Sequence, residues 1–140
     1  TGEMAHKIAE GLKKAGNIEV DLTDIENILP GELEEKIVRC NGIIIGSPTI
    51  NQNTLLPVYK LFSLVNPIRD KGKLAAAFGS YGWSGEAVKL IEDQLKNLKF
   101  DIAMEGISEK FYPFDGKSDR IIEFGKAFGV KLLEKKITDT

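Results

Sequence analysis

The hydrophobic positions of this chain follow helical and strand periods in turn, and each change of period marks an expected element. Residues 3–15 place Met4, Ile8 and Leu12 at helical spacing, which predicts a helix that ends at Gly16. Apolar and polar residues then alternate over 17–22, which predicts a strand with one covered face. The later expected elements are a helix over 32–39, a strand over 42–46, a helix over 55–65, a strand over 73–78, a helix over 84–98, a strand over 101–108 and a helix over 118–136.

Two of the expected strands contain a continuous apolar run: 42–46 is GIIIG, and the strand over 73–78 contains LAAAF at 74–78. Such runs are typical of strands that are buried on both faces, as in a parallel sheet with helices on each side. Strict alternation of helices and strands therefore predicts one α/β domain over 1–140, a three-layer αβα sandwich with a doubly wound parallel sheet. A domain of this kind normally begins with a strand, and this chain begins with a helix. We therefore expect an amino-terminally truncated domain whose first strand is missing.

The composition says little about the fold, but it limits the classes of function that the chain can have. The 140 residues are 42% hydrophobic and 29% charged, with a formal net charge of -2 and a pI near 5.5. This balance favours neither nucleic acid nor an anionic membrane as a partner. No apolar run is long enough to span a bilayer. A single Cys, Cys40, indicates a reducing, cytoplasmic location, and a single His, His6, excludes a multi-His metal site. We assign no catalytic residue and no metal ligand.

Three segments are expected at the carboxyl edge of the sheet, where open parallel sheets bind their ligands. The most informative is 79–85, GSYGWSG, which follows the second buried strand. Its glycines permit sharp turns, and Tyr81 and Trp83 lie outside any helical or strand stripe. Such aromatics suit stacking on a planar ring. A loop that is simply well packed over the sheet end is the equally weighted alternative.

The other two segments are weaker signals. The stretch 47–53, SPTINQN, offers uncharged hydroxyls and amides that can hydrogen-bond to the edge of a heterocycle, or merely cap the next helix. Thr1 and Gly2 precede the first helix, whose free amino-terminal N–H groups can hold a phosphate. The chain contains neither a P-loop nor a GxGxxG motif.

These loops together resemble one family. GIIIGSPTINQNTLLP and LAAAFGSYGWSGEAVKLI, in this order and spacing, are similar to the flavodoxin-like domain of flavodiiron proteins, also called A-type flavoproteins. MAHKIAEGL resembles the first helix of that domain, and the similarity continues through the last expected helix. The resemblance implies a five-stranded parallel sheet of order 2-1-3-4-5 that binds FMN.

Carried over by position, the resemblance implies that two loops line the flavin ring and that Thr1 ends the phosphate loop. The cofactor-binding residues implied are Thr1, Ser47, Pro48, Thr49, Ile50, Asn51, Ser80, Tyr81, Gly82, Trp83 and Ser84.

The sequence departs from this family pattern in two ways. The metallo-β-lactamase-like domain that carries the diiron site is absent, so these 140 residues alone cannot reduce O₂ or NO. The first strand and most of the phosphate loop are also absent. Three outcomes are open for the empty position: the two flanking strands pair directly, another chain fills it, or the native chain is longer. We favour a truncated chain and expect self-association to stabilise it.

The leading hypothesis is an FMN-binding electron-transfer domain. It would relay electrons from a reductase or a rubredoxin-like donor to a diiron centre that reduces O₂ or NO. The alternative is a flavodoxin-like fragment that no longer binds FMN, since its phosphate loop is truncated, and that acts as a structural or interaction module. A flavin-dependent quinone reductase is a weaker third hypothesis, because no residue argues for a nicotinamide pocket.

Overall fold

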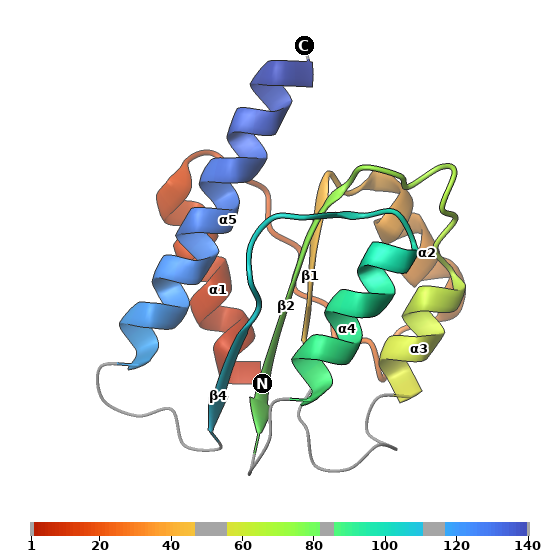
Figure 1. Cartoon of the computed structure of the whole chain (residues 1–140), viewed down its shortest axis with the longest axis horizontal. Coiled ribbons are helices and arrows are strands. Elements are labelled where there is room, and N and C mark those ends of the chain that lie inside the picture. Colours follow the sequence, from red (N-terminus) through yellow and green to blue (C-terminus); the bar gives the residue numbers. More distant parts are fainter. Residues whose placement is uncertain (1, 47–55, 82–85, 111–116, 140) are drawn as a thin grey trace.

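The computed structural model describes residues 2–46, 56–81, 86–110 and 117–139 of the chain. Helices and strands alternate for most of its length (Figure 1). In chain order the elements are α1 (Gly2–Ala15), α2 (Pro30–Arg39), β1 (Gly42–Gly46), α3 (Leu56–Ser63), β2 (Leu74–Tyr81), α4 (Glu86–Asn97), β3 (Asp101–Ile102), β4 (Ile107–Lys110) and α5 (Lys117–Asp139).

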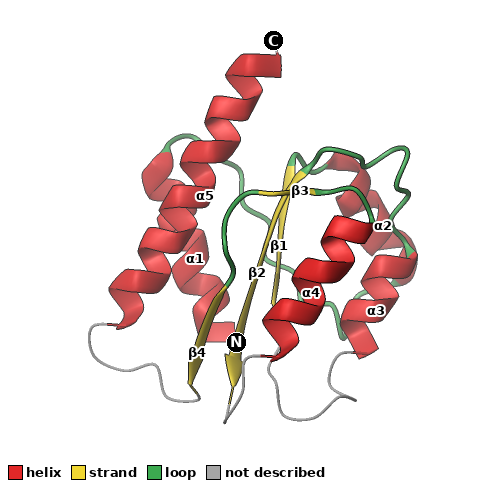
Figure 2. Ribbon diagram, in the orientation of Figure 1, coloured by secondary structure: helices red, strands yellow, loops and turns green. Residues whose placement is uncertain are grey.

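All the strand pairs among these residues are parallel, and β2 is the central strand (Figure 2). On one side β1 pairs with β2 in a register that sets Ile44 opposite Ala76. On the other side β3 pairs with the beginning of β2 and β4 with its end, where Phe78 faces Ile107. The predicted parallel α/β sheet is therefore confirmed.

Helices cover both faces of the sheet, as the continuous apolar strands predict. We call the two apolar cores the α2–α4 cluster and the α1/α5 cluster, after the helices that build them. The α2–α4 cluster contains Leu33, Ile37, Ile45, Val58, Leu61, Phe62, Val65, Ala75, Ala77, Val88, Ile91, Leu95 and Phe100. The α1/α5 cluster contains Met4, Ile8, Leu12, Leu74, Ala76, Phe78, Ile107, Ile121, Phe124, Phe128 and Leu132.

The two helices of the α1/α5 cluster lie directly against each other, because glycines stand at the contact. A Cβ on Gly11 would collide with the carbonyl of Ile122, and one on Gly125 would collide with the carbonyl of Ile8. Each backbone thus occupies the space that a side chain of the other helix would need. This close packing fixes where α1 begins relative to the sheet.

The strand expected over 17–22 does not form. Residues 18–24 are non-helical and belong to no strand of the sheet, although Ile18 and Val20 do pack against the α1/α5 cluster. Alternation correctly predicted one covered face, but a strand also needs a neighbour for its backbone, and within the described residues none pairs with this segment. The two flanking segments, 18–22 and β1, do not pair with each other.

Two other strands differ from expectation. β1 is less buried than its continuous apolar run predicts: Ile45 is 3% exposed, while Ile43 and Ile44 are only half-buried. The strand expected over 101–108 is divided into β3 and β4. At the break, the Gly106 N–H donates a hydrogen bond to Glu92 Oε2 of α4 at 2.9 Å. This N–H therefore pairs with a helix side chain and not with a neighbouring strand.

Candidate functional site

The carboxyl ends of the long strands meet at one edge of the sheet. β1 ends at Gly46, β2 at Tyr81 and β4 at Lys110, and the strands run parallel. The described start of α1, at Gly2, lies near this same edge, at the bottom of Figure 1. This edge therefore has the position of a ligand site in an open α/β sheet.

The floor of this edge is apolar and tightly packed. Gly46 lies opposite Phe78 in the sheet register, and a Cβ at Gly46 would overlap the Phe78 ring. Phe78 itself is buried in the α1/α5 cluster. The glycine at the end of β1 is thus required by the neighbouring ring, and the backbone of β1 stays close to β2 up to its last described residue.

Only part of the predicted site falls on described residues. Ser80 and Tyr81 are the last two residues of β2, and their backbones pair with Glu109 and Lys110 of β4. β2 is thus longer than the expected strand, and it carries these two residues to the edge. The other predicted site residues lie outside the described residues, and their roles stay predictions: Thr1, Ser47, Pro48, Thr49, Ile50, Asn51, Gly82, Trp83 and Ser84.

The topology adds a segment that the sequence analysis did not count. Residues 111–116 directly follow β4, which ends at the same edge as β2. The signal was present in the sequence, because any strand of a parallel sheet delivers the next segment to the carboxyl edge.

The lone His and the lone Cys do not form a reactive site. His6 is exposed on α1. Burial raises the pKa of the Cys40 thiol, and its Sγ donates to the Ile37 carbonyl at 3.1 Å. The raised pKa and this hydrogen bond both favour the protonated, unreactive form of the thiol. Among the described residues, no three His, Cys, Asp or Glu side chains gather as a metal site.

A buried ionic cluster lies just ahead of β2, at the opposite end of that strand from the candidate site. The Asp70 carboxylate is 0% exposed and accepts hydrogen bonds from Arg69 Nη2 at 2.7 Å, from Lys73 Nζ at 2.9 Å and from the Asn66 N–H at 3.0 Å. Burial opposes ionisation of this carboxyl, but these hydrogen bonds outweigh it and lower its pKa to about 2.

Lys73 also donates to the carbonyls of Ile37 and Val38, near the end of α2. These carbonyls are among those that the helix itself leaves unpaired. The cluster therefore fastens α2 to the beginning of β2, which is a structural role.

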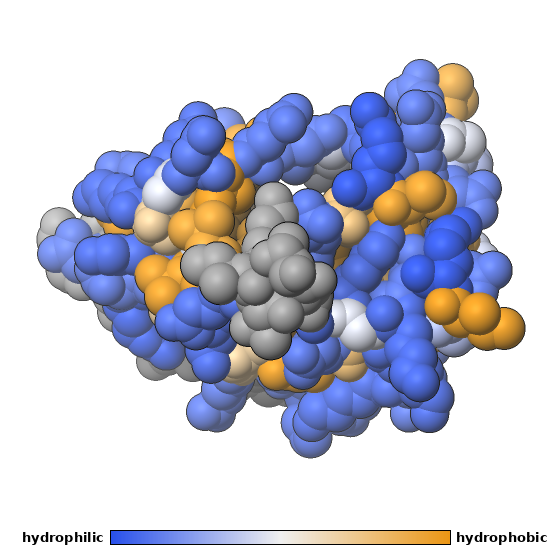
Figure 3. Space-filling model, turned by 90° about the horizontal axis from the view of Figure 1, so that it is seen from above, coloured by the Kyte–Doolittle hydropathy of each residue, from blue (hydrophilic) through white to orange (hydrophobic). Residues whose placement is uncertain are grey.

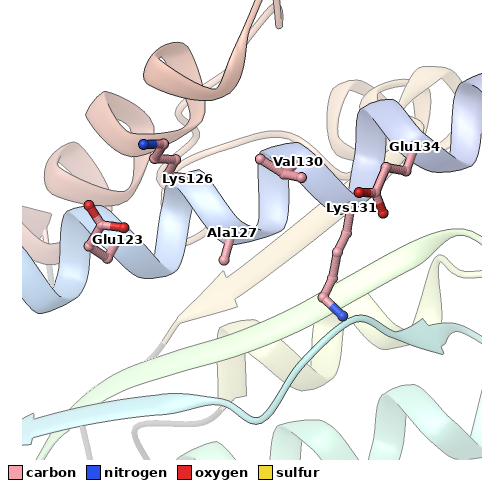
Figure 4. Close-up of a pocket in the computed structure, with 6 residues that line it drawn as sticks. All are labelled: Glu123, Lys126, Ala127, Val130, Lys131 and Glu134. Carbon is pink, nitrogen blue, oxygen red and sulfur yellow. The ribbon is translucent and has the colours of Figure 1, made fainter.

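A depression of about 380 Å³ lies elsewhere, along α5 (Figure 4). Its walls all come from that one helix: Glu123, Lys126, Ala127, Val130, Lys131 and Glu134. A ligand pocket normally has walls from several elements that converge on it. The carboxyl edge remains the better candidate site, because several strands and helices end or begin there.

The described part of the chain has no helix that is both long enough and apolar enough to cross a membrane. A parallel sheet covered by helices on both faces, with its connecting segments at the carboxyl edge, defines a doubly wound α/β protein. Within that class, a family model described as Flavodoxin matches residues 1–124. The chain belongs to the flavodoxin family.

Its relatives include flavodiiron proteins. It is 36% identical over 126 residues to the flavo-diiron protein FprA2 of Clostridium acetobutylicum, which covers 89% of this chain and 32% of that protein. It is 42% identical over 113 residues to the putative diflavin flavoprotein A 4 of Synechocystis sp., covering 81% of this chain and 19% of that one. The chain thus spans a third or less of the length of these curated relatives.

Solved structures agree with this assignment. The rubredoxin oxygen:oxidoreductase of Desulfovibrio gigas superposes with a TM-score of 0.85 at 26% identity, over 95% of this chain and 33% of that one. An archaeal flavodoxin superposes with a TM-score of 0.74 at 29% identity, over 93% of this chain and 88% of that one. The chain therefore corresponds to the flavodoxin-like part of the longer relatives.

Proposed function

We propose that this chain is an FMN-binding electron-transfer domain. The observation that carries the proposal is the convergence of β1, β2, β4 and the start of α1 at one edge of the sheet. This edge delivers the segments that the flavodiiron resemblance assigns to the flavin.

The side chains of these segments are of the kinds that can bind a flavin ring. Ser47–Asn51 and Ser80–Ser84 carry hydroxyls, an amide, an indole and a phenol, and no charged side chain. Such groups can hydrogen-bond to the edge of the ring, while Tyr81 and Trp83 offer flat surfaces for stacking. The N–H groups at the start of α1, next to Thr1, would hold the phosphate. FMN supplies the redox chemistry, and the chain holds and orients it.

We propose that, in a longer protein, this domain transfers electrons between a donor protein and a second redox centre. A reductase or a rubredoxin-like donor would deliver electrons to it. A diiron centre in a metallo-β-lactamase-like domain would accept them and reduce O₂ or NO. The chain has one His, so the ligands of such a centre would come from outside these 140 residues. We also propose a cytoplasmic location, which the single, half-buried Cys40 favours.

One observation favours the alternative, a flavodoxin-like fragment that serves as a structural or interaction module without FMN. Within the described residues, β1 is paired on one side only. An unpaired edge is a common surface for association with another chain.

Titration with FMN tests the proposal directly. Trp83 is the only Trp, so its fluorescence should be quenched as FMN binds, and the purified protein should retain flavin absorbance. Replacing Tyr81 with Ala should weaken binding by about tenfold, because a ring contact contributes on the order of 1 kcal/mol beyond its buried area. Tyr59→Ala is the matched control, since Tyr59 is an exposed residue of α3.

Absence of both flavin absorbance and Trp83 quenching at micromolar FMN would reject FMN binding by this chain. Equal weakening by the Tyr81 and Tyr59 variants would reject the assigned role of Tyr81.

A further inference from the structure

The break between β3 and β4 inserts extra residues into the edge of the sheet. From Ala75 to Phe78, β2 advances three residues. Over the same stretch its neighbour advances five residues, from Ile102 to Ile107, which is two more than the ladder accommodates. Insertions of this kind are frequent at sheet edges and beside active sites, where they redirect the strand that follows. Here the strand that follows is β4, which ends at the candidate site.

A close contact with α4 returns the chain to the sheet after the break. A Cβ on Gly106 would lie 2.9 Å from the Ala77 carbonyl oxygen and 2.5 Å from Val88 Cγ1. Glycine is required here, because the backbone comes close to both β2 and α4. The Gly106 N–H donates to Glu92 Oε2 at 2.9 Å. Val88 and Glu92 stand four residues apart, so they share one face of α4.

Among the described residues, apolar packing directs the chain only weakly across the break. Just before it, the Ala103 N–H donates to the Ala75 carbonyl at 2.9 Å, and strand pairing resumes at Ile107. Ala103 and Met104 pack only partly against the α1/α5 cluster. Figure 3 shows that the end of the molecule at which β3 lies is mostly hydrophilic at its surface. A directed hydrogen bond from α4 therefore has a large share in deciding where β4 begins.

β4 is tied to both elements that flank the segment 82–85. Tyr81, the last residue of β2, pairs with the end of β4. Glu86 begins α4, which the hydrogen bond between Glu92 and Gly106 ties to the start of β4. Glu92 lies about 9 Å along the helix axis from the start of α4. β4 therefore links the strand that precedes this segment with the helix that follows it (Figure 2).

We propose that Glu92 is a positioning residue for the flavin-binding segment 80–84. Its carboxylate holds the Gly106 N–H, and this hydrogen bond sets where β4 begins. β4 in turn fixes the end of β2 relative to the start of α4. Glu92 acts through these elements to orient the side chains that meet the flavin ring. This inference rests on the proposed function, which assigns the segment to the flavin.

Titration with FMN, followed by Trp83 quenching, is the first test. Glu92→Ala removes the acceptor, whereas Glu92→Gln keeps an acceptor oxygen and loses only the charge. We expect Glu92→Ala to bind FMN about tenfold more weakly and Glu92→Gln to stay within about twofold of the native chain. Both variants lose the same charge, so their difference isolates the hydrogen bond. Asp93→Ala is the matched control: it removes an exposed carboxylate of α4 that pairs only with Lys89, at 3.4 Å, and should leave the affinity unchanged.

A purely structural role of Glu92 predicts a different result. It would lower the free energy of unfolding of Glu92→Ala and leave the FMN dissociation constant of the folded molecules unchanged. Affinity is therefore measured well below the melting temperature, with the folded state checked by circular dichroism. Native affinity in Glu92→Ala would overturn the proposal, and so would equal weakening by the Ala and Gln variants. If Glu92→Ala does not fold, Glu92→Asp replaces it with the same expected weakening, since its carboxylate is one methylene too short.

Hydrogen exchange without FMN separates this inference from the proposed function. Glu92→Ala should speed exchange by about tenfold at Gly106 and at the paired strand ends, residues 80–81 and 109–110, and leave Ala76 unchanged. Faster exchange at Gly106 alone would overturn the proposal, because β4 would then keep its place without Glu92.

The titrations and the exchange measurements fail in different ways. A native chain that binds no FMN would reject the proposed function and, with it, the flavin-binding role of Glu92. A native chain that binds FMN, together with a Glu92→Ala variant that binds it equally well, would reject only the positioning role.

Discussion

β1 and β2 are neighbouring strands with similar apolar sequences and different surroundings. Ala75, Ala76 and Ala77 in β2 are each 0% exposed, and β2 is paired on both sides. In β1, Ile43 and Ile44 are only half-buried, and its described pairing is on one side. Burial of a strand in an α/β sheet thus depends on neighbours at its two edges as much as on the helices over its faces.

The difference also decides where apolar area remains to be gained. The central positions of β2 carry alanines, which are small and already fully covered. β1 carries three isoleucines, whose side chains offer much more apolar surface. Because the hydrophobic effect scales with the area removed from water, a neighbour on the open edge of β1 would stabilise the fold more than any added contact at β2.

The largest expected effect comes from a charge placed on each strand at the same level. Ala76 and Ile44 are register partners and pack against the same cluster. Ala76→Asp buries a carboxyl that has no partner, so we expect a loss of about 4 kcal/mol or more, enough to unfold the domain. Ile44→Asp should cost roughly half as much, since water reaches that position. Urea unfolding followed by circular dichroism measures both.

Ala76→Asn serves as the matched control for size, because its amide group has nearly the same volume as the carboxyl group of Asp and carries no charge. An Ile44→Asp variant that is as destabilised as Ala76→Asp would contradict the open-edge description of β1.

The residues ahead of the two strands extend the comparison. Before β1, Cys40 makes a hydrogen bond from its thiol to the Ile37 carbonyl. Before β2, buried Asp70 binds Arg69 and Lys73. Removing one member of a buried ion pair leaves charges without partners, so Asp70→Asn should cost about 3 kcal/mol at neutral pH.

The same carboxyl predicts a pH dependence. The pKa of Asp70 is lowered to about 2 in the folded chain, below its ordinary value of 3.8. The ionised Asp70 carboxyl therefore contributes fully to the free energy of unfolding at pH values above its ordinary pKa. This contribution is lost as the pH falls through about 4 toward 2. That contribution is about 2 kcal/mol, at about 1.4 kcal/mol for each pKa unit.

Unfolding free energies of the native chain and Asp70→Asn, measured from pH 7 to pH 2, should converge in that window. Parallel curves would contradict the shift. Glu34→Gln is the control: it removes only the partly exposed 3.5 Å ion pair to Arg69, so it should cost less than about 1 kcal/mol.

The sequence predicted the helices well because their periodicity is local. Ile121, Phe124, Phe128 and Leu132 recur at spacings of three and four, and all four are buried in α5. A strand depends on distant backbone, which periodicity does not report. The segment 17–22 alternates correctly and still lacks a ladder, because no described strand lies beside it.

The candidate site was predictable in position rather than in detail. Alternation of strands and helices locates the carboxyl edge, and the structure places Ser80 and Tyr81 there. The sequence did not predict the buried ionic cluster at Asp70. Its members, Arg69, Asp70 and Lys73, belong to a polar turn whose sequence is typical of an exposed turn. The sequence also did not predict the break between β3 and β4 at Gly106, where the Glu92 side chain of α4 accepts the hydrogen bond of the Gly106 N–H.

The smallest expected effect concerns two turns that meet where β2 and β3 begin. The Gly72 N–H donates to the Lys99 carbonyl at 2.9 Å, and both residues have positive φ, +84° and 71°. Glycine adopts this conformation without strain, whereas lysine does so at a cost of roughly 1 kcal/mol. Lys99→Gly should relieve this strain and stabilise the domain by about 0.5 kcal/mol, since greater freedom of the unfolded chain offsets part of the gain.

Gly72→Ala should have the opposite sign and lose about 1 kcal/mol, because it introduces the strain that Lys99 already carries. Lys96→Gly is the matched control, since Lys96 is exposed in the last turn of α4 and helical glycine costs about 1 kcal/mol. Thermal unfolding of the three variants separates the effects: only Lys99→Gly should raise the melting temperature. A lowered melting temperature for Lys99→Gly would mean that the lysine side chain contributes more through its contacts than its backbone strain costs.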